Sequence, residues 1–191
     1  MSSPTFPQVG QDAESDPVQP GILIIGLGNP ILGDDGVGWK VAAQVERQLR
    51  ASNHDAIRGI DHEAVQVEYL SLGGLSLMEN MIGFDKVVLI DSITTGNHPR
   101  GSILRFNLED LPRNVYGHLS SAHDASLQNA LAVGRGLGAK LPEQTRIVAV
   151  EIQPTYDFSE DLSSEVAAAI PAAAEAVFEV LEEISSTLSE G

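Results

Sequence analysis

Two short, continuous apolar runs constrain most strongly how this chain can fold. The segments "ILII" (22–25) and "VVLI" (87–90) contain no polar residue. Runs of this length without alternation are typical of strands that are buried on both faces, as in the parallel sheets of α/β proteins. Both runs are far too short to cross a bilayer. We therefore expect a sheet that is covered by helices on both faces.

Strands and helices are predicted to alternate along the chain. The first helix is recognised by apolar residues at helical spacing, such as Val37, Val41 and Val45. Strands are expected at residues 21–26, 65–70, 86–91, 102–108 and 146–152, and helices from Asp34 to about Leu49, at 73–81, from 123 to about 137 and at 163–187, with a kink or restart at Pro171. This order predicts an α/β fold, a three-layer αβα sandwich with an open, mostly parallel twisted sheet.

A chain of 191 residues fits one domain, and a monomer is favoured. Residues 1–20 hold four prolines, three acids and no basic residue, which is typical of a segment that cannot bury enough apolar surface to order itself. We therefore expect a flexible N-terminal tail over 1–20 and a single α/β domain over 21–190. With no membrane-spanning run and no signal-like stretch, the protein is expected to be soluble and cytoplasmic.

Charge and cysteine content exclude several classes of function. The chain has 27 acidic and 11 basic residues, a formal net charge of −16, and no cysteine. A surface of this sign repels nucleic acid, so nucleic acid is not an expected partner. Without cysteine there is no disulfide and no thiolate ligand. Any metal site must therefore use Asp, Glu, His or backbone oxygens.

The glycine-rich stretch "GLGNPILGDDGVG" (26–38) follows the first predicted strand. It begins like a dinucleotide-binding fingerprint, but Ile31 stands where the third glycine is needed. Two of its glycines have P-loop spacing, but Asp34 and Asp35 replace the Lys and Ser or Thr that bind phosphate. Two carboxylates at a helix start repel anions, so the loop favours a cation. The letters "GLGNP" are also similar to bacterial peptidyl-tRNA hydrolases, but the Tyr and the Arg-His-Asn of that family are absent.

Three side chains are predicted to meet at the carboxyl edge of the sheet, where the βα loops gather. Asp35 follows the first strand, Asp91 ends the strand at 86–91, and His123 stands at the start of a predicted helix. Each has an ordinary alternative: Asp34 or Asp35 as a helix cap, Asp91 as a turn residue, and His123 as a surface residue. Together, two carboxylates and an imidazole would form an open site for a borderline divalent metal such as nickel or zinc.

Four stretches resemble the hydrogenase maturation endopeptidases, which trim the C-terminus of the large subunit of [NiFe] hydrogenases. They are "IIGLGNPILGDDGVGWKVA", "GGLSLMENM", "KVVLIDSITTGNHPRGSI" and "SSAHDASLQNAL", in family order. The resemblance covers about 22–130, and the closing helix is also similar. The turn "GDDGVG" is its most specific part.

The resemblance implies particular roles for three residues. Asp35 matches the family's first metal-binding carboxylate, which is Glu in several members, Asp91 matches the second, and His123 matches the imidazole ligand. All three are expected to serve as metal ligands and catalytic groups. The family's glycine pair is met at 73–74, but Leu72 replaces the acid that often precedes it, so no role is assigned to that loop.

The resemblance also implies a fold of the phosphorylase/hydrolase-like type and a reaction. The protease would probe nickel already inserted into the large-subunit precursor, so the nickel belongs to the substrate and is bound transiently. Cleavage could use a metal-polarised water or a carboxylate as general base, and the family is sometimes classed with aspartic proteases. Two alternatives stay open: a nickel-dependent binding chaperone that does not cleave, and a metal-dependent amide hydrolase of the same fold.

Overall fold

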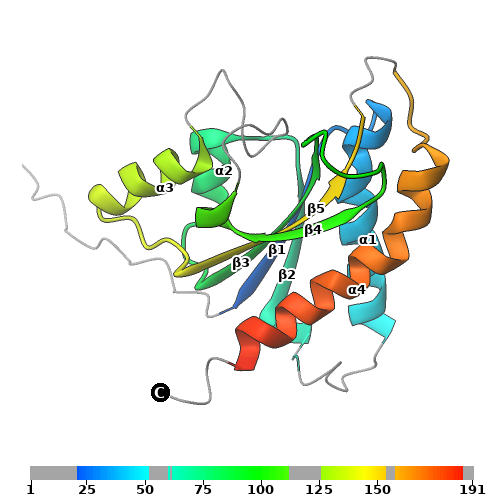
Figure 1. The fold of residues 1–191 in the computed structure, drawn as a ribbon. Coiled ribbons are helices and arrows are strands. Elements are labelled where there is room, and N and C mark those ends of the chain that lie inside the picture. Colours follow the sequence, from blue (N-terminus) through cyan, green and yellow to red (C-terminus); the bar gives the residue numbers. More distant parts are fainter. Residues whose placement is uncertain (1–20, 52–59, 61, 112–125, 154–157, 187–191) are drawn as a thin grey trace, which may run out of the picture.

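A computed structural model describes residues 21–51, 60, 62–111, 126–153 and 158–186. The predicted N-terminal tail over 1–20 lies outside these ranges, as does His123. The described residues form five strands, four α-helices and three short 3-10 helices (Figure 1). The strands are β1 (Ile22–Leu27), β2 (Val65–Leu70), β3 (Lys86–Ile93), β4 (Ile103–Asn107) and β5 (Gln144–Glu151); the helices are α1 (Val37–Ala51), α2 (Gly74–Asn80), α3 (Leu127–Gly136) and α4 (Ser164–Ser186), with 3-10 helices η1 (Gly33–Gly36), η2 (His62–Ala64) and η3 (Leu108–Asp110).

The five strands form one sheet in the order β2-β1-β3-β5-β4. The pairs β1–β2, β1–β3 and β3–β5 are parallel, and β4 runs antiparallel to β5 at the edge. Helices α1 and α4 pack together on one face, and α2 and α3 cover the other (Figure 1). The predicted three-layer α/β architecture with a mostly parallel sheet is confirmed.

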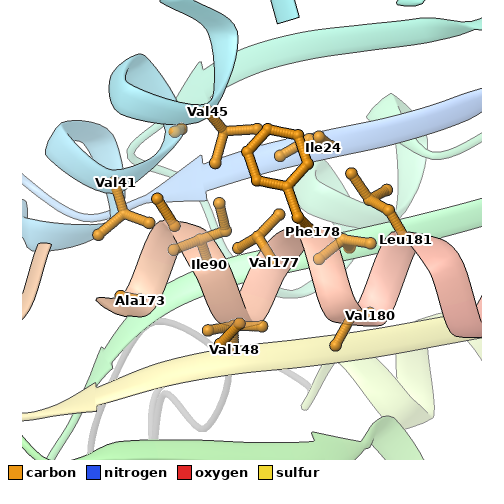
Figure 2. Close-up of a cluster of buried hydrophobic side chains, with 14 of the residues drawn as sticks. Ile24, Val41, Val45, Ile90, Val148, Ala173, Val177, Phe178, Val180 and Leu181 are labelled. Atoms are coloured by element: carbon orange, nitrogen blue, oxygen red, sulfur yellow. The ribbon is translucent and has the colours of Figure 1, made fainter. Parts of the chain in front are cut away.

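The position of β3 inside the sheet explains why its sequence is apolar without alternation. Val88 and Ile90 belong to the apolar cluster under α1 and α4, whereas Val87 and Leu89 belong to the cluster under α2 and α3. Successive side chains of a strand point to opposite faces, and here both faces are buried. Figure 2 shows the first cluster, in which side chains of α1 and α4 meet those of the strands: Ile24, Val41, Val45, Ile90, Val148, Val177, Phe178 and Leu181.

Helix α4 runs continuously through Pro171, so the predicted restart at this residue is wrong. A proline inside a helix costs about 3 kcal/mol because it removes one backbone hydrogen bond and its ring crowds the preceding turn. The helix buries Val166 before the proline and Ala173 and Ala174 after it. Because the apolar face continues on both sides, packing against the sheet outweighs the local cost.

The end of α4 is fixed by a buried lysine. Lys86 at the start of β3 is 9% exposed, and its Nζ donates to the carbonyl oxygen of Ile184 in the last turn of α4. A cation at this position donates a hydrogen bond to a helix carbonyl and stabilises the negative end of the helix dipole.

Among the helices that the structure describes, none is both long and apolar enough to span a membrane.

Candidate functional site

The carboxyl ends of β1 and β3 lie side by side where the strand order changes direction. From β1 the sheet continues to β2 on one side and to β3 on the other. In open α/β sheets, ligands bind beyond the carboxyl ends of the strands at such a switch point. Helix η1 follows β1 and carries Asp34 and Asp35, while Asp91 lies near the end of β3.

Glycines allow η1 and α1 to lie directly against the strand ends. A Cβ on Gly28, whose φ is +131°, would lie 1.9 Å from the carbonyl oxygen of Asp35. A Cβ on Gly38 would lie 2.2 Å from the carbonyl oxygen of Leu27 and 2.4 Å from that of Ile90. Such distances exclude any side chain. These two glycines therefore serve close backbone packing, which brings Asp35 to the edge of the sheet.

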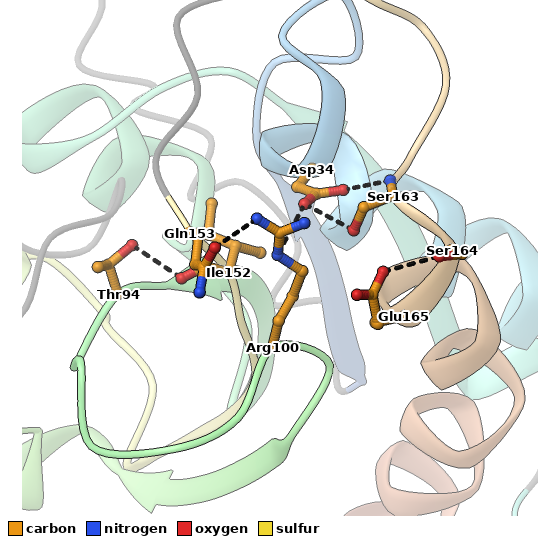
Figure 3. A network of polar contacts seen from close by, with 8 residues as sticks. All are labelled: Asp34, Thr94, Arg100, Ile152, Gln153, Ser163, Ser164 and Glu165. Atoms are coloured by element: carbon orange, nitrogen blue, oxygen red, sulfur yellow. Dashed lines mark hydrogen bonds and ion pairs between the residues drawn. The ribbon is translucent and has the colours of Figure 1, made fainter.

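Asp34 is a structural anchor for the start of α4. Its side chain is buried, its Oδ1 accepts from the backbone N–H of Ser163 at 2.6 Å, and its Oδ2 accepts from the Ser163 hydroxyl at 2.9 Å (Figure 3). The Nε atom of Arg100 lies 4.0 Å from Oδ2. The alternative that Asp34 caps the helix following it is wrong, because its carboxylate is used on the residue that precedes α4.

Arg100 joins this anchor to the end of the sheet. It lies between β3 and β4, and its Nη2 donates to Oε1 of Gln153 at 2.6 Å (Figure 3). On the first turn of α4, the Ser164 hydroxyl donates to Glu165 at 2.8 Å and lowers the pKa of that carboxyl. These contacts connect the segments around the edge without involving Asp35 or Asp91.

Asp35 and Asp91 are linked by one serine. Asp35 is half-buried; its Oδ2 accepts from the backbone N–H of Asn29 at 2.8 Å, and its Oδ1 accepts from the hydroxyl of Ser92 at 3.1 Å. Asp91 is fully buried, and its Oδ1 accepts from the backbone N–H of Ser92 at 2.8 Å. The structure thus brings Asp35 to the hydroxyl of Ser92, the residue that follows Asp91 in β3. The roles of Asp35 and Asp91 as metal ligands and catalytic groups stay a prediction.

The donor set of the two carboxylates is compatible with a divalent cation, because both supply oxygen atoms from separate elements at one edge. The described ranges hold no group of three or more His, Cys, Asp and Glu residues placed to bind a metal ion. His123, the predicted third ligand, lies outside those ranges. The two carboxylates would therefore form part of a site that needs further ligands.

Sequence reasoning missed a further buried acid at this edge, besides Asp34 and Asp91. Glu151 ends β5 and is 2% exposed. Its Oε1 accepts from the backbone N–H groups of Thr95 and Gly96, each at 2.9 Å, and its Oε2 accepts from the Thr95 hydroxyl at 2.8 Å. It fixes the loop that follows β3. The signal was present, because "RIVAVE" ends in an acid as "KVVLID" does.

Comparison with known proteins identifies the family of this chain. The family model HycI, described as hydrogenase maturation protease, matches residues 58–180. The hydrogenase expression/formation protein HupD of Thiocapsa roseopersicina is 25% identical over 144 residues, 75% of this chain and 59% of that protein. The matched regions span about three fifths of the length of several curated relatives.

Solved structures share the fold. The hydrogenase maturating endopeptidase HybD from Escherichia coli matches with a TM-score of 0.63 and 21% identity over 85% of this chain and 93% of that one. The [NiFe] hydrogenase maturation protease HybD from Thermococcus kodakarensis matches with a TM-score of 0.59 and 22% identity over 84% and 98%. With the family model covering more than half of the sequence, the chain belongs to the hydrogenase maturation protease family.

Proposed function

We propose that this chain is an endopeptidase that removes the C-terminal extension of a [NiFe] hydrogenase large-subunit precursor after nickel insertion. Membership of the hydrogenase maturation protease family supports peptide hydrolysis. The Thermococcus kodakarensis protein that shares this fold is a [NiFe] hydrogenase maturation protease, which supports a [NiFe] hydrogenase as the target. The precursor is thus the proposed partner.

The observation that carries the proposal is the link between Asp35 and Asp91 through Ser92 at the switch point of the sheet. The hydroxyl of Ser92, which follows Asp91 in β3, donates to Asp35 in η1, although 56 positions separate the two acids in the sequence. Packing of the helices does not require this contact, because Asp34 already joins η1 to Ser163 at the start of α4. Two carboxylates at the ligand-binding edge of an open sheet are typical of a catalytic or metal-binding site.

The nickel in this proposal belongs to the substrate. Asp35, Asp91 and His123 would add two oxygen donors and one imidazole to an ion that the precursor already holds. Such a donor set binds nickel more weakly than one that includes thiolates, because softer ligands hold late transition metals more strongly. The protease can therefore contact the ion without extracting it. Because the three side chains bind the precursor through this ion, nickel insertion is a condition for cleavage.

Hydrolysis consumes one water for each peptide bond. The water oxygen bonds to the scissile carbonyl carbon, the C–N bond breaks, and the departing nitrogen gains a proton. A carboxylate of Asp35 or Asp91 could accept the proton of the attacking water as general base, or the water could be activated by the substrate's ion. Both routes use the same residues, and both require the carboxylates to be held in a fixed orientation.

The proposal is tested by adding the purified chain to nickel-loaded precursor and following the mass of the large subunit. The wild-type chain should shorten it at the C-terminus, and Asp91→Asn should abolish the reaction while the chain stays folded. Asp85→Asn is the matched control, since Asp85 adjoins the other end of β3 and pairs with Lys140 at 3.7 Å. It should cleave normally. A precursor that is bound but not shortened would support the chaperone alternative instead.

A further inference from the structure

Ser92 is buried between the two carboxylates of the proposed site. It follows Asp91 in β3 and is 2% exposed. Because strand side chains alternate, its hydroxyl points to the face covered by α1 and α4, opposite to the side chain of Asp91. This is the face from which η1 brings Asp35. Ser92 therefore stands where the two acids approach the edge from different sides of the sheet.

Ser92 donates hydrogen bonds to the two acids through different groups. Its backbone N–H donates to Asp91, and its side-chain hydroxyl donates to Asp35. A serine hydroxyl has a single proton to donate, and here that proton goes to Asp35. Replacing the side chain would remove the second bond and leave the first. The contribution of the hydroxyl can thus be separated from that of the strand.

The bond from Ser92 restricts how the Asp35 carboxylate can turn. Its Oδ2 is held by the backbone N–H of Asn29 and its Oδ1 by Ser92. A carboxylate with a donor on each oxygen has a fixed plane, which sets the directions in which its oxygens can meet a ligand. Outer partners of this kind orient metal-binding groups, and their loss typically lowers metal affinity about 10- to 100-fold.

We infer that Ser92 is a positioning residue, whose hydroxyl fixes the orientation of the Asp35 carboxylate for contact with a divalent metal ion. This inference rests on the proposed function, since it assigns a positioning role to a residue of the same site. It predicts that the hydroxyl of Ser92 acts on metal affinity and turnover through Asp35. It does not predict a large effect on folding.

The test titrates Ni²⁺ alone into the full chain by calorimetry and measures cleavage of nickel-loaded precursor. Ser92→Ala should weaken nickel binding about tenfold or more and lower kcat and kcat/KM for the nickel-loaded precursor, while the melting temperature changes little. Ser92→Thr keeps a hydroxyl and should restore much of the affinity. Ser163→Ala is the matched control, because it removes a serine-to-aspartate bond of the same kind from Asp34. It should leave nickel affinity unchanged.

A double-mutant cycle identifies the route of the effect. If Ser92 acts through Asp35, Ser92→Ala should cause no further loss of nickel affinity in an Asp35→Ala background. Equal losses in both backgrounds would overturn the inference, and so would wild-type affinity and kcat in Ser92→Ala. If the wild-type chain neither binds nickel nor cleaves the precursor, the proposed function fails and this inference fails with it. Cleavage by the wild type with an unaffected Ser92→Ala variant overturns the inference alone.

Discussion

Asp34 and Asp35 are adjacent in the chain but have separate tasks. Asp34 turns inward and binds both polar groups of Ser163, whereas Asp35 reaches the carboxyl edge and binds Asn29 and Ser92. A repeated acid in a short turn thus combines an anchor for α4 with a residue of the candidate site. The two roles can be separated by single substitutions.

Asp34→Ala should lower the free energy of unfolding by about 2 to 3 kcal/mol, because it leaves the N–H and hydroxyl of Ser163 without their acceptor. Urea denaturation measures this loss. Asp161→Ala is the control, since Asp161 lies in the same segment with an exposed side chain; it should change stability by less than about 0.5 kcal/mol. Equal stability of the Asp34→Ala variant and the wild type would contradict the anchor role.

The sequence predicted where Asp35 and Asp91 lie, because a residue that follows a parallel strand must lie at the carboxyl edge. It did not predict Ser92 or Glu151 as partners at that edge. A hydroxyl after an acid is common, and only the register of β3 against its neighbours shows that Ser92 faces η1. The assignment of Asp34 depended on residue 163, which is distant in sequence and meets Asp34 only when α4 docks.

The contact between α1 and the strands depends on a missing side chain at Gly38. Gly38→Ala places a Cβ against the carbonyl oxygens of Leu27 and Ile90, both backbone atoms that cannot move aside cheaply. The variant should lose about 3 kcal/mol of stability. Gly136→Ala, at the end of α3 with nothing within 4 Å of the added Cβ, should be neutral or stabilise slightly. Urea unfolding of both variants checks this contrast, and an unchanged midpoint for Gly38→Ala would contradict the close packing.

A second contact joins α1 to β2. The Tyr69 hydroxyl donates to Oε2 of Glu46 at 2.7 Å, and burial, followed by this hydrogen bond and the charge of Glu46, raises the pKa of Tyr69 to about 12. The ring of Tyr69 also packs edge-on against Trp39, with centroids 5.7 Å apart. Since the pKa of an unfolded tyrosine is about 10, the folded state favours the protonated phenol. This contribution to stability is complete below about pH 10 and is lost as the pH rises through about 12.

Ultraviolet titration of the phenolates should therefore show a late step, in which Tyr69 ionises well above the usual range. In Glu46→Gln the late step should move to lower pH, because the carboxylate charge that opposes the phenolate is gone. A late step at the same pH in that variant would show that burial alone causes the shift.

The pattern of hydrophobic residues predicted which segments are strands and which are helices, and in what order they occur. Strand β2 was predicted at its observed bounds. Two features did not follow. The antiparallel direction of β4 depends on the connection from β3 turning back at the edge, which periodicity does not encode. The start of α1 at Val37 instead of Asp34 reflects the 3-10 turn of η1, whose residues pack closely against the Gly28 turn.

The alternation of strands and helices along the whole chain was enough to predict a sheet between two helical layers. Both apolar clusters extend along β1, β3 and β5, the central strands, so each layer is held by the same strands. The candidate site lies at the end of these strands, where a rigid core supports it. The third proposed ligand, His123, lies in a segment outside the described residues, and its place in the site remains a prediction.

The central claim is that Asp35, Asp91 and His123 contact a nickel ion that the precursor carries. The direct test offers the chain equal concentrations of metal-free, zinc-loaded and nickel-loaded precursor and follows the mass of the large subunit. We predict that the nickel-loaded form alone is shortened, and that this is lost in His123→Ala and after chelation of the precursor. Equal shortening of all three forms would contradict the claim and would favour a pair of carboxylates that acts without the substrate's metal.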